Sequence, residues 1–336
     1  TVASLWLLCV FCSAQQIARA RHVQLVTTTG TAATDTLHLI SKGGITFIGN
    51  STSFRQNGKL TLYSNPSSGN SDWLDSTNGV IHSSSTGMVN FYGTSVLQQL
   101  TGPTTFYGLT VNGIGINQNQ SNEVRGQLNL TTGLIYIPDV DDSIYVSNPA
   151  LTAITYDPDS FATTSWVHGK LSRRMNIASP SQYVFPIGKI KAGDSLYAPI
   201  KFEKQNTSAV TFSAQYFPSL PFDYTNHDLT IDHVSQMEYW EITSHNYSAY
   251  PADATGYLYL SWRDYSVVSP IAAVRDSLLI AQYFDAGIGT MWNARSNVPA
   301  TLSAGHTVNW GFIRSTNVLG DFTDTAYLFT LATRSA

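Results

Sequence analysis

Cysteine is nearly absent from this sequence. The two cysteines, Cys9 and Cys12, both lie close to residue 1, so the rest of the chain can form neither a disulfide nor a cysteine-based metal site. Charged residues are also scarce, at 12% of the chain, which is about half the usual share. With a formal net charge of -4, the chain lacks the basic face that nucleic-acid binding requires.

Long apolar runs are missing as well. No run is long enough to span a bilayer, so we expect no membrane span in the mature chain. Hydrophobic residues still make up 43% of the 336 residues, which is enough for folded cores and too many for a disordered chain. The length predicts about two domains, and we expect their surfaces to be neutral and rich in Ser, Thr, Asn and Gln.

The first residues have the pattern of a targeting segment. Residues 3–14 are apolar and end in small side chains before Gln15, which is typical of a signal peptide cleaved after Ala14. We therefore predict a signal peptide over residues 1–14 and an exported mature chain without cysteine. A buried first strand is the alternative interpretation. A lipoprotein signal is disfavoured because neither cysteine follows a small residue.

Short strand-like runs, separated by Gly and Asn, dominate the first half. Similar runs such as Gly58-Lys-Leu-Thr-Leu and Gly126-Gln-Leu-Asn-Leu recur at spacings of roughly 20–30 residues, the length of one solenoid coil. We predict that residues 15–178 form a right-handed parallel β-helix, a β-solenoid with apolar side chains inside and ladders of Thr and Asn outside. A β-sandwich built from hairpins is the alternative. The runs are Val23–Thr27, Leu37–Ile40, Ile45–Ile48, Leu60–Tyr63, Val89–Tyr92, Phe106–Asn112, Leu128–Thr131, Leu134–Ile137 and Ile144–Ser147.

The second half has longer apolar runs and most of the tryptophans. In the run 256–263, Leu258, Leu260 and Trp262 alternate with the residues of a second face, which is the period-two pattern of a strand. Many short strands separated by turn signals predict an antiparallel β-sandwich over residues 179–336.

A turn around Pro180 marks the change in composition between the two halves. We predict a domain junction there, in which one apolar pair closes the final coil and a later pair opens the first strand of the sandwich. The basic pair between them is expected to pair with acids, and a contact with an acidic sugar is the alternative. The residues assigned to this junction are Trp166, Val167, Arg173, Arg174, Phe185 and Ile187.

Several segments resemble, in order, the units of one family. Ser84–Asn112 resembles G-x-V-x-F-x-G…Q-x-I-x-G…T-F-Y-N-L-x-I-N, and Val124–Ile135 resembles the V-x-G-x-L-x-L-x-x-G-x-L that follows it. Trp166–Arg174 is similar to F-V-x-G-P-L-x-R, and Tyr183–Lys189 to F-x-F-P-V-G. These units recur in large secreted surface proteins of the Bacteroidota, which are typical cargo of the type IX secretion system.

The resemblance extends through the second half. From Glu238 onward the chain resembles, in order, x-Y-W-E-I, V-T-L-S-W-x-D, L-x-V-A-x-Y, W-x-N and F-T-L-A-S of the domain that follows the solenoid in this family. The departures are small: Lys170 replaces the usual Pro, and Gly108 the usual Asn. The resemblance implies an extracellular or cell-surface module that is structural or adhesive and not catalytic. Its implied partners are other surface proteins, further copies of itself, or glycans.

A tripeptide of Asp, then Ser or Thr, then an apolar residue or Thr recurs along the chain. It resembles the O-glycosylation motif of the same bacterial group, and sugars would suit an exported surface without disulfides. Because the motif is short, chance alone could produce several of the matches. The candidate glycosylation residues are Thr36, Ser76, Ser143, Ser195, Ser277 and Thr325.

Two acidic clusters are candidate metal sites. Asp139, Asp141 and Asp142 offer close carboxylates that suit calcium, but they lack a Gly-turned ligand loop, and a solvated turn is favoured. His227–Asp228 and Asp232–His233 offer two imidazoles and two carboxylates at a spacing that matches no strong motif, so a polar loop is favoured there. We expect no cofactor, with calcium as the candidate ion.

Two alternatives stand beside the structural or adhesive module. One is a carbohydrate-binding protein with an exposed aromatic platform, although tryptophans within strand runs favour core packing. The other is a β-helix polysaccharide-degrading enzyme, which needs clustered acids or a basic residue on one solenoid face. No catalytic sequence motif is present, so we predict no enzymatic activity. The platform candidates are Trp73, Trp240, Trp262, Trp292 and Trp310.

Overall fold

A computed structural model gives the fold of most of the chain. The predicted signal peptide, residues 1–14, lies outside the residues that the structure describes. The described residues are 19–20, 23–26, 38–41, 44–47, 58–63, 72–75, 85–157, 165–178, 181–207, 209–245, 255–263, 266, 277–285, 290–295, 310–315 and 326–334.

The protein is all-β, which confirms the predicted class. The described residues contain no α-helix, and a short 3₁₀ turn spans Leu151–Ala153. The strands form large mixed sheets with both parallel and antiparallel pairs. The chain divides into two compact units: unit 1 comprises residues 1–148 and 152–169, and unit 2 comprises residues 149–151 and 170–336. The boundary predicted from the sequence, after residue 178, lies further along the chain.

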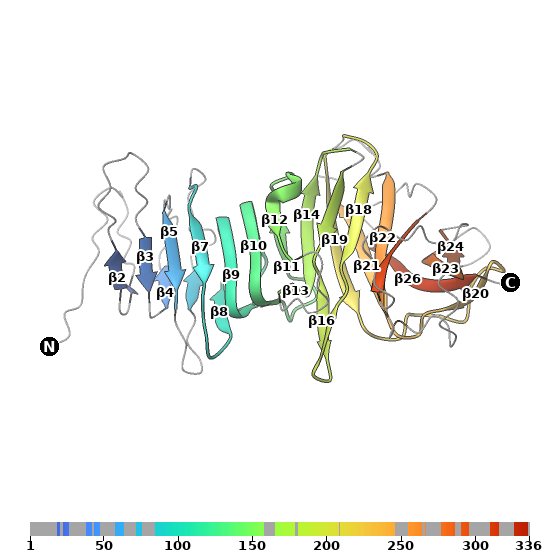
Figure 1. Cartoon of the computed structure of the whole chain (residues 1–336), viewed down its shortest axis with the longest axis horizontal. Coiled ribbons are helices and arrows are strands. Elements are labelled where there is room, and N and C mark those ends of the chain that lie inside the picture. Colours follow the sequence, from blue (N-terminus) through green and yellow to red (C-terminus); the bar gives the residue numbers. More distant parts are fainter. Residues whose placement is uncertain are drawn as a thin grey trace. The chain divides into compact units, whose positions relative to one another are not determined.

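Unit 1 is built mainly from strands that pair in parallel. Its strands are β1 (Arg19–Ala20), β2 (Val23–Val26), β3 (His38–Ser41), β4 (Ile45–Phe47), β5 (Lys59–Leu62), β6 (Trp73–Asp75), β7 (Met88–Phe91), β8 (Gln98–Thr101), β9 (Thr105–Gln118), β10 (Asn122–Tyr136), β11 (Ser143–Val146), β12 (Ile154–Thr155) and β13 (Val167–His168). One parallel series runs β3–β5–β7–β9–β10 and a second runs β4–β6–β8–β9. Figure 1 shows the strands of the first series side by side in chain order. β1 with β4 and β2 with β3 pair antiparallel.

The register of the first series stacks apolar residues into a column. Leu60, Val89, Leu109 and Leu128 are successive partners on β5, β7, β9 and β10, and Ile154 on β12 follows Leu128. All five are buried. Because neighbouring strands lie about 4.8 Å apart, each of these side chains packs on the next. Burial of each such side chain stabilises the fold by roughly 1.5–3 kcal/mol.

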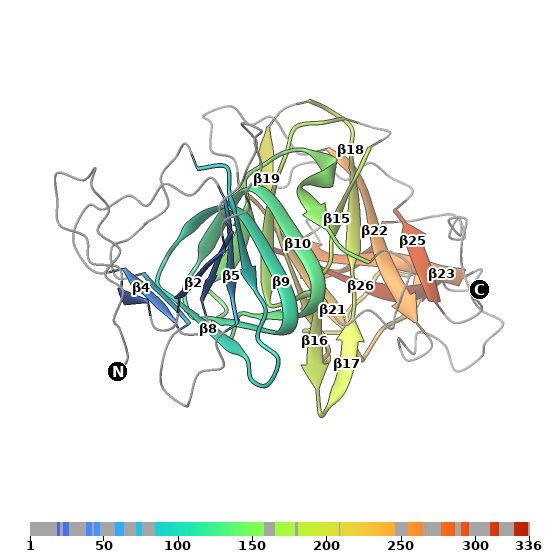
Figure 2. The same ribbon diagram turned by 60° about the vertical axis from the view of Figure 1, so that its left-hand side comes forward.

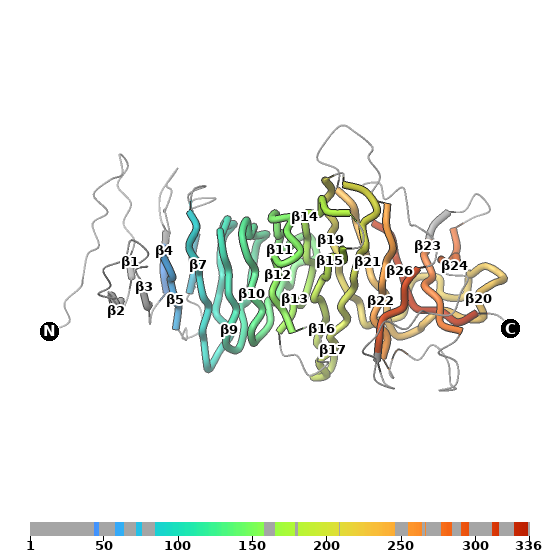
Figure 3. The backbone as a smooth tube through the Cα atoms, turned by 45° about the horizontal axis from the view of Figure 1, so that its top comes forward, coloured from blue at the N-terminus to red at the C-terminus, as the bar shows by residue number. Residues whose placement is uncertain are grey.

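The long strands β9 and β10 bend, and two glycines permit the bend. Gly115 has a φ of 129° and Gly133 a φ of 76°. Residues with a side chain rarely adopt positive φ angles of this kind. A Cβ added to Gly115 would lie 2.4 Å from the carbonyl oxygen of Leu134, so the two backbones approach too closely for any side chain. The pairing of β9 with β10 shifts register in this region, and Figure 3 shows the two strands curving together.

Unit 2 is built from antiparallel pairs. Its strands are β14 (Lys170–Met175), β15 (Gln182–Phe185), β16 (Gly188–Lys191), β17 (Asp194–Tyr197), β18 (Ile200–Lys204), β19 (Val210–Phe217), β20 (Ile231–Val234), β21 (Tyr239–His245), β22 (Gly256–Arg263), β23 (Leu278–Asp285), β24 (Thr290–Ala294), β25 (Trp310–Arg314) and β26 (Ala326–Arg334). One series runs β14–β19–β21–β26–β23–β24. A separate four-stranded sheet has the order β15–β18–β22–β25, and Figure 2 shows its strands together.

The four-stranded sheet has one buried face and one partly exposed face. Phe185, Phe202, Leu258 and Leu260 are buried on its inner face, and they alternate along the strands with less buried neighbours such as Val184. Hydrophobic burial of the inner face holds this sheet to the rest of unit 2. On the outer face, Lys201, Tyr257 and Arg314 are intermediate in burial.

Candidate functional site

The outer face of the sheet β15–β18–β22–β25 gathers cations and aromatic rings. Lys201, Tyr259 and Arg314 are register partners on three neighbouring strands and form one row across the sheet. The guanidinium carbon of Arg314 lies 3.5 Å from the centroid of the Tyr257 ring, and Lys201 Nζ lies 4.1 Å from that of Phe312. Both distances are within the range of favourable cation–π contacts.

A buried carboxylate lies beside this row. Glu203 accepts a hydrogen bond of 2.6 Å from the Tyr259 hydroxyl, and its other oxygen lies 3.6 Å from an Arg314 nitrogen. Burial and this hydrogen bond to Glu203 raise the pKa of Tyr259 to about 12, because both disfavour the phenolate. The tyrosine therefore keeps its proton at neutral pH and acts as a fixed donor to Glu203.

No sequence motif marks this face. The period-two pattern of 256–263 places Tyr257 and Tyr259 on the same side of a strand, which was the available signal. The third partner, Arg314, lies far along the chain, and its pairing with β22 depends on tertiary structure.

Polar side chains form ladders between the parallel strands of unit 1, but Thr61 and Asn90 are buried, whereas we expected such ladders on the outside. Asn90 donates to the Thr61 hydroxyl over 3.1 Å and Asn129 to the Thr110 hydroxyl over 3.2 Å, and these four residues lie in one register row. On the second series, the Asn117 amide donates to Gln99 over 2.9 Å. Such side-chain bonds between adjacent strands fix the register of each strand against the next.

The candidate calcium residues form a turn. The Asp139 carboxylate accepts a hydrogen bond of 3.0 Å from the backbone N–H of Asp141, and Asp142 accepts one of 3.1 Å from the Ser121 hydroxyl. Across the described ranges, no three side chains of His, Cys, Asp or Glu come together to hold a metal ion. Asp139 and Asp141 are exposed, and Asp142 is half-buried.

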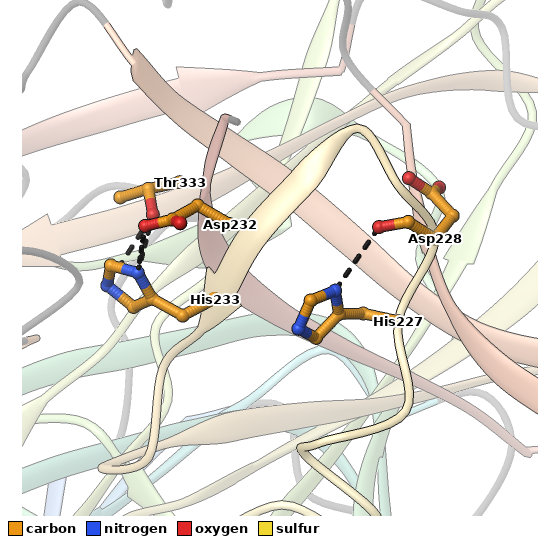
Figure 4. A network of polar contacts seen from close by, with 5 residues as sticks. All are labelled: His227, Asp228, Asp232, His233 and Thr333. Carbon is orange, nitrogen blue, oxygen red and sulfur yellow. Dashed lines mark hydrogen bonds and ion pairs between the residues drawn. The ribbon is translucent and has the colours of Figure 1, made fainter. Parts of the chain in front are cut away.

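The two His–Asp pairs belong to unit 2 and make separate local contacts (Figure 4). His227 Nδ1 lies 3.2 Å from the backbone oxygen of Asp228. His233 Nδ1 lies 2.9 Å from the Asp232 carboxylate and 2.9 Å from the Thr333 hydroxyl. Each imidazole therefore contacts its own sequence neighbour, and the two pairs do not form one shared site.

Asp228 has a structural role in this loop. Its carboxylate accepts hydrogen bonds from the backbone N–H of Thr230 over 2.7 Å and of Ala294 over 2.9 Å. Burial raises the pKa of Asp228, but the hydrogen bonds outweigh burial and leave the pKa below its usual value. The ionised carboxylate thereby ties the loop to strand β24.

The predicted junction residues divide between the two units. Trp166 and Val167 belong to unit 1, where the Trp166 carbonyl accepts from Ile135 N over 3.1 Å and Val167 pairs with Ile135 in parallel. In unit 2, β14 precedes β15, so Phe185 lies on the second strand of that unit and not on the first. Phe185 and Ile187 are both fully buried.

The basic pair at the predicted junction has one buried and one exposed member. Arg173 donates from its guanidinium to the carbonyl oxygens of Val184, Ala150 and Leu151 over 2.9, 2.9 and 2.7 Å, all within unit 2. We expected acids as the partners of this pair, whereas these partners of Arg173 are backbone carbonyls. Arg174 is exposed. The alternation follows from their neighbouring positions on β14, which point to opposite faces.

The candidate glycosylation residues differ in accessibility. Ser195 is exposed on β17, and Ser143 and Ser277 are half-buried. The other three, Thr36, Ser76 and Thr325, lie outside the described residues.

The tryptophans pack in cores. Trp73, Trp240, Trp262 and Trp292 are all buried, and the side chain of Trp310 lies outside the described set. Trp73 Nε1 donates to the Thr104 hydroxyl and Trp240 Nε1 to the Ala198 carbonyl, both over 3.0 Å. These four rings therefore cannot form an exposed stacking platform, and core packing is confirmed for them.

Comparison with family models, with curated proteins and with solved structures finds no match for the chain. Among the ranges that the structure describes, no helix has the length and apolar character needed to cross a membrane.

Proposed function

We propose that the protein is an exported, non-catalytic structural or adhesive module of a cell surface. In this proposal unit 1 is a right-handed parallel β-helix that serves as a stalk, and unit 2 is an antiparallel β-sandwich. The proposal includes export by the signal peptide at residues 1–14 and a place among the type IX secretion cargo that the sequence resembles.

One observation carries the proposal. Successive strands β5, β7, β9 and β10 pair in parallel and in register, with a buried apolar column on one side and hydrogen-bonded polar residues on the other. Each coil then contacts only its neighbours and repeats the same contacts, which is the construction of a solenoid. Such a stack forms a stiff rod without disulfides, as a chain with only two cysteines requires.

The test is an adhesion and turnover assay on the purified chain. Beads coated with the protein are exposed to a glycan panel and to further copies of the protein, and released sugars are measured on the same panel. The proposal predicts retention on at least one of these surfaces without release of sugar. Turnover of any polysaccharide, abolished by Asp141→Asn or Asp142→Asn, would contradict the non-catalytic assignment.

A carbohydrate-binding role is the second candidate, and a specific observation favours it. The cation–aromatic row on the sheet β15–β18–β22–β25 is partly exposed, with Arg314, Lys201 and Tyr257 all intermediate in burial. An aromatic side chain can stack on a sugar ring, and a planar guanidinium group can bind the carboxylate of an acidic sugar. This candidate uses tyrosine and arginine, and not the tryptophans considered from the sequence.

A further inference from the structure

We propose that the outer face of the sheet β15–β18–β22–β25 binds an acidic saccharide chain, with Arg314 and Lys201 taking its carboxylates and Tyr257 its ring face. The inference rests on the second candidate function above and names its ligand class. It is independent of whether unit 1 acts as a stalk.

The guanidinium of Arg314 has unused donor capacity. Its side chain is 35% exposed, it stacks on Tyr257, and its polar partner is Glu203 at 3.6 Å, which is beyond hydrogen-bonding distance. Within the described part of the chain, the buried Nε has no hydrogen-bond partner. An arginine carries five donors in a planar fork that matches a carboxylate. The exposed nitrogens of Arg314 can therefore donate hydrogen bonds to a carboxylate of a ligand.

The surroundings favour an anionic sugar over a neutral one. Lysine and arginine number only 18 in 336 residues, yet Lys201 and Arg314 lie in the same row of this face. They are two strand spacings apart, about 10 Å, so one extended chain with repeated carboxylates can reach both. The carboxylate of Glu203 is buried and accepts a 2.6 Å hydrogen bond from Tyr259. Lys201 and Arg314 are therefore more accessible to a ligand than this negative charge is.

Ring stacking makes a sugar a better occupant than an acidic peptide. The guanidinium carbon of Arg314 lies over the Tyr257 ring, 3.5 Å from its centroid, and this half-buried ring offers apolar surface next to the cation. A uronic acid carries both an apolar C–H face and a carboxylate on one ring, so it can use the two side chains together. A peptide carboxylate on a flexible side chain can use only the charge.

Titration calorimetry with oligogalacturonate tests the inference on the full chain. Arg314→Gln is compared with Arg334→Gln, which removes the same charge from an exposed position on β26. We expect Arg314→Gln and Tyr257→Leu each to weaken binding at least tenfold, and Arg334→Gln to leave it within twofold. Wild-type affinity should also fall as salt is raised. If Arg314→Gln does not fold, Lys201→Gln and the salt series carry the test.

Three results would overturn the inference: no binding of oligogalacturonate by the wild-type chain, equal loss for Arg314→Gln and Arg334→Gln, or equal affinity for polyglutamate. The last would mean attraction of any anion and not recognition of a sugar. The two proposals can be separated by the adhesion assay. If the Arg314→Gln variant is still retained on the beads but no longer binds oligogalacturonate, adhesion does not depend on this site.

Discussion

The side-chain amide of Asn90 donates a hydrogen bond of 3.1 Å to the hydroxyl of Thr61, its register partner on the preceding parallel strand. Both residues are buried, although they lie 29 positions apart in the sequence. The same row continues with Asn129 and Thr110 on the next two strands. Neighbouring parallel strands are therefore joined by polar bonds as well as by the apolar column.

Removing one ladder bond should destabilise unit 1. Asn90→Ala deletes the bond to Thr61 in a buried row, and we expect a loss of about 1–2 kcal/mol in the free energy of unfolding. Thr132→Ala deletes an exposed bond to Asn112 and should cost less than about 0.5 kcal/mol. Urea unfolding of the two variants measures this difference. Equal losses would show that burial does not strengthen the ladder.

Arg173 should be essential to unit 2 and its neighbour Arg174 dispensable. Arg173→Met leaves the carbonyls of Ala150, Leu151 and Val184 without their charged donor, and we expect a loss of at least about 3 kcal/mol in unfolding free energy. Arg174 is exposed on the same strand, so Arg174→Met should lie within about 0.5 kcal/mol of wild type. Thermal unfolding compares the pair. A similar effect of both changes would indicate a general charge effect.

Glu238 should make the stability of unit 2 depend on pH. Burial raises its pKa, against hydrogen bonds from Ser266 and Tyr216 that lower it. The pKa of Glu238 is higher in the folded than in the unfolded chain. The contribution of protonated Glu238 to the free energy of unfolding is therefore complete below the unfolded pKa and is lost as pH rises through the folded pKa. Glu238→Gln cannot ionise and keeps an acceptor for the Tyr216 hydroxyl. It should unfold at a higher temperature than wild type above the folded pKa and at the same temperature in acid.

The control for this change is Glu241→Gln, which removes a charge from the adjoining strand β21 at a half-buried position. It should show no comparable gain as pH rises. If Glu238→Gln is less stable than wild type across the whole pH range, the carboxylate stabilises the fold in its charged form and the assignment is wrong.

Tyr259 should titrate late and weaken the fold when it does. Its pKa of about 12 exceeds the usual value of 10.0. The contribution of the protonated tyrosine to the free energy of unfolding is therefore complete below pH 10 and is lost as pH rises toward 12. Tyrosinate absorbance, compared with Tyr259→Phe, should show one ionisation missing from the variant near the upper end of the titration. The variant should also lose stability less steeply above pH 10. A difference spectrum centred at the ordinary tyrosine pKa would contradict the burial argument.

Local patterns predicted the strand class and much of the core. The alternation of Leu258, Leu260 and Trp262 correctly identified a buried face, and the matching runs at Leu60 and Leu128 lie in one register column. Strands β6 and β8 were missed, because they are short and their polar residues, such as Gln98, are buried through bonds made only in the folded chain. Gln98 donates to the Leu62 carbonyl over 3.1 Å.

The partners of single polar side chains were the least predictable feature. Arg173 reaches carbonyls 22 and 23 positions away, and backbone carbonyls carry no mark in the sequence. Arg314 joins Tyr257 and Glu203 only because three distant segments form one sheet. The proposed binding face was therefore visible only after the strands had been paired.

Deletion of one whole coil tests the central claim, that unit 1 is a stack of equivalent coils. Met88 and Gly108 are register partners, so removal of residues 89–108 joins Met88 directly to Leu109 and leaves the apolar column continuous. Removal of residues 89–98 breaks the register and brings Gln99 into the place of a core residue. We predict that the whole-coil deletion unfolds cooperatively, with the far-ultraviolet circular dichroism of a β protein, and that the half-coil deletion does not. Equal disruption by both deletions would contradict the account.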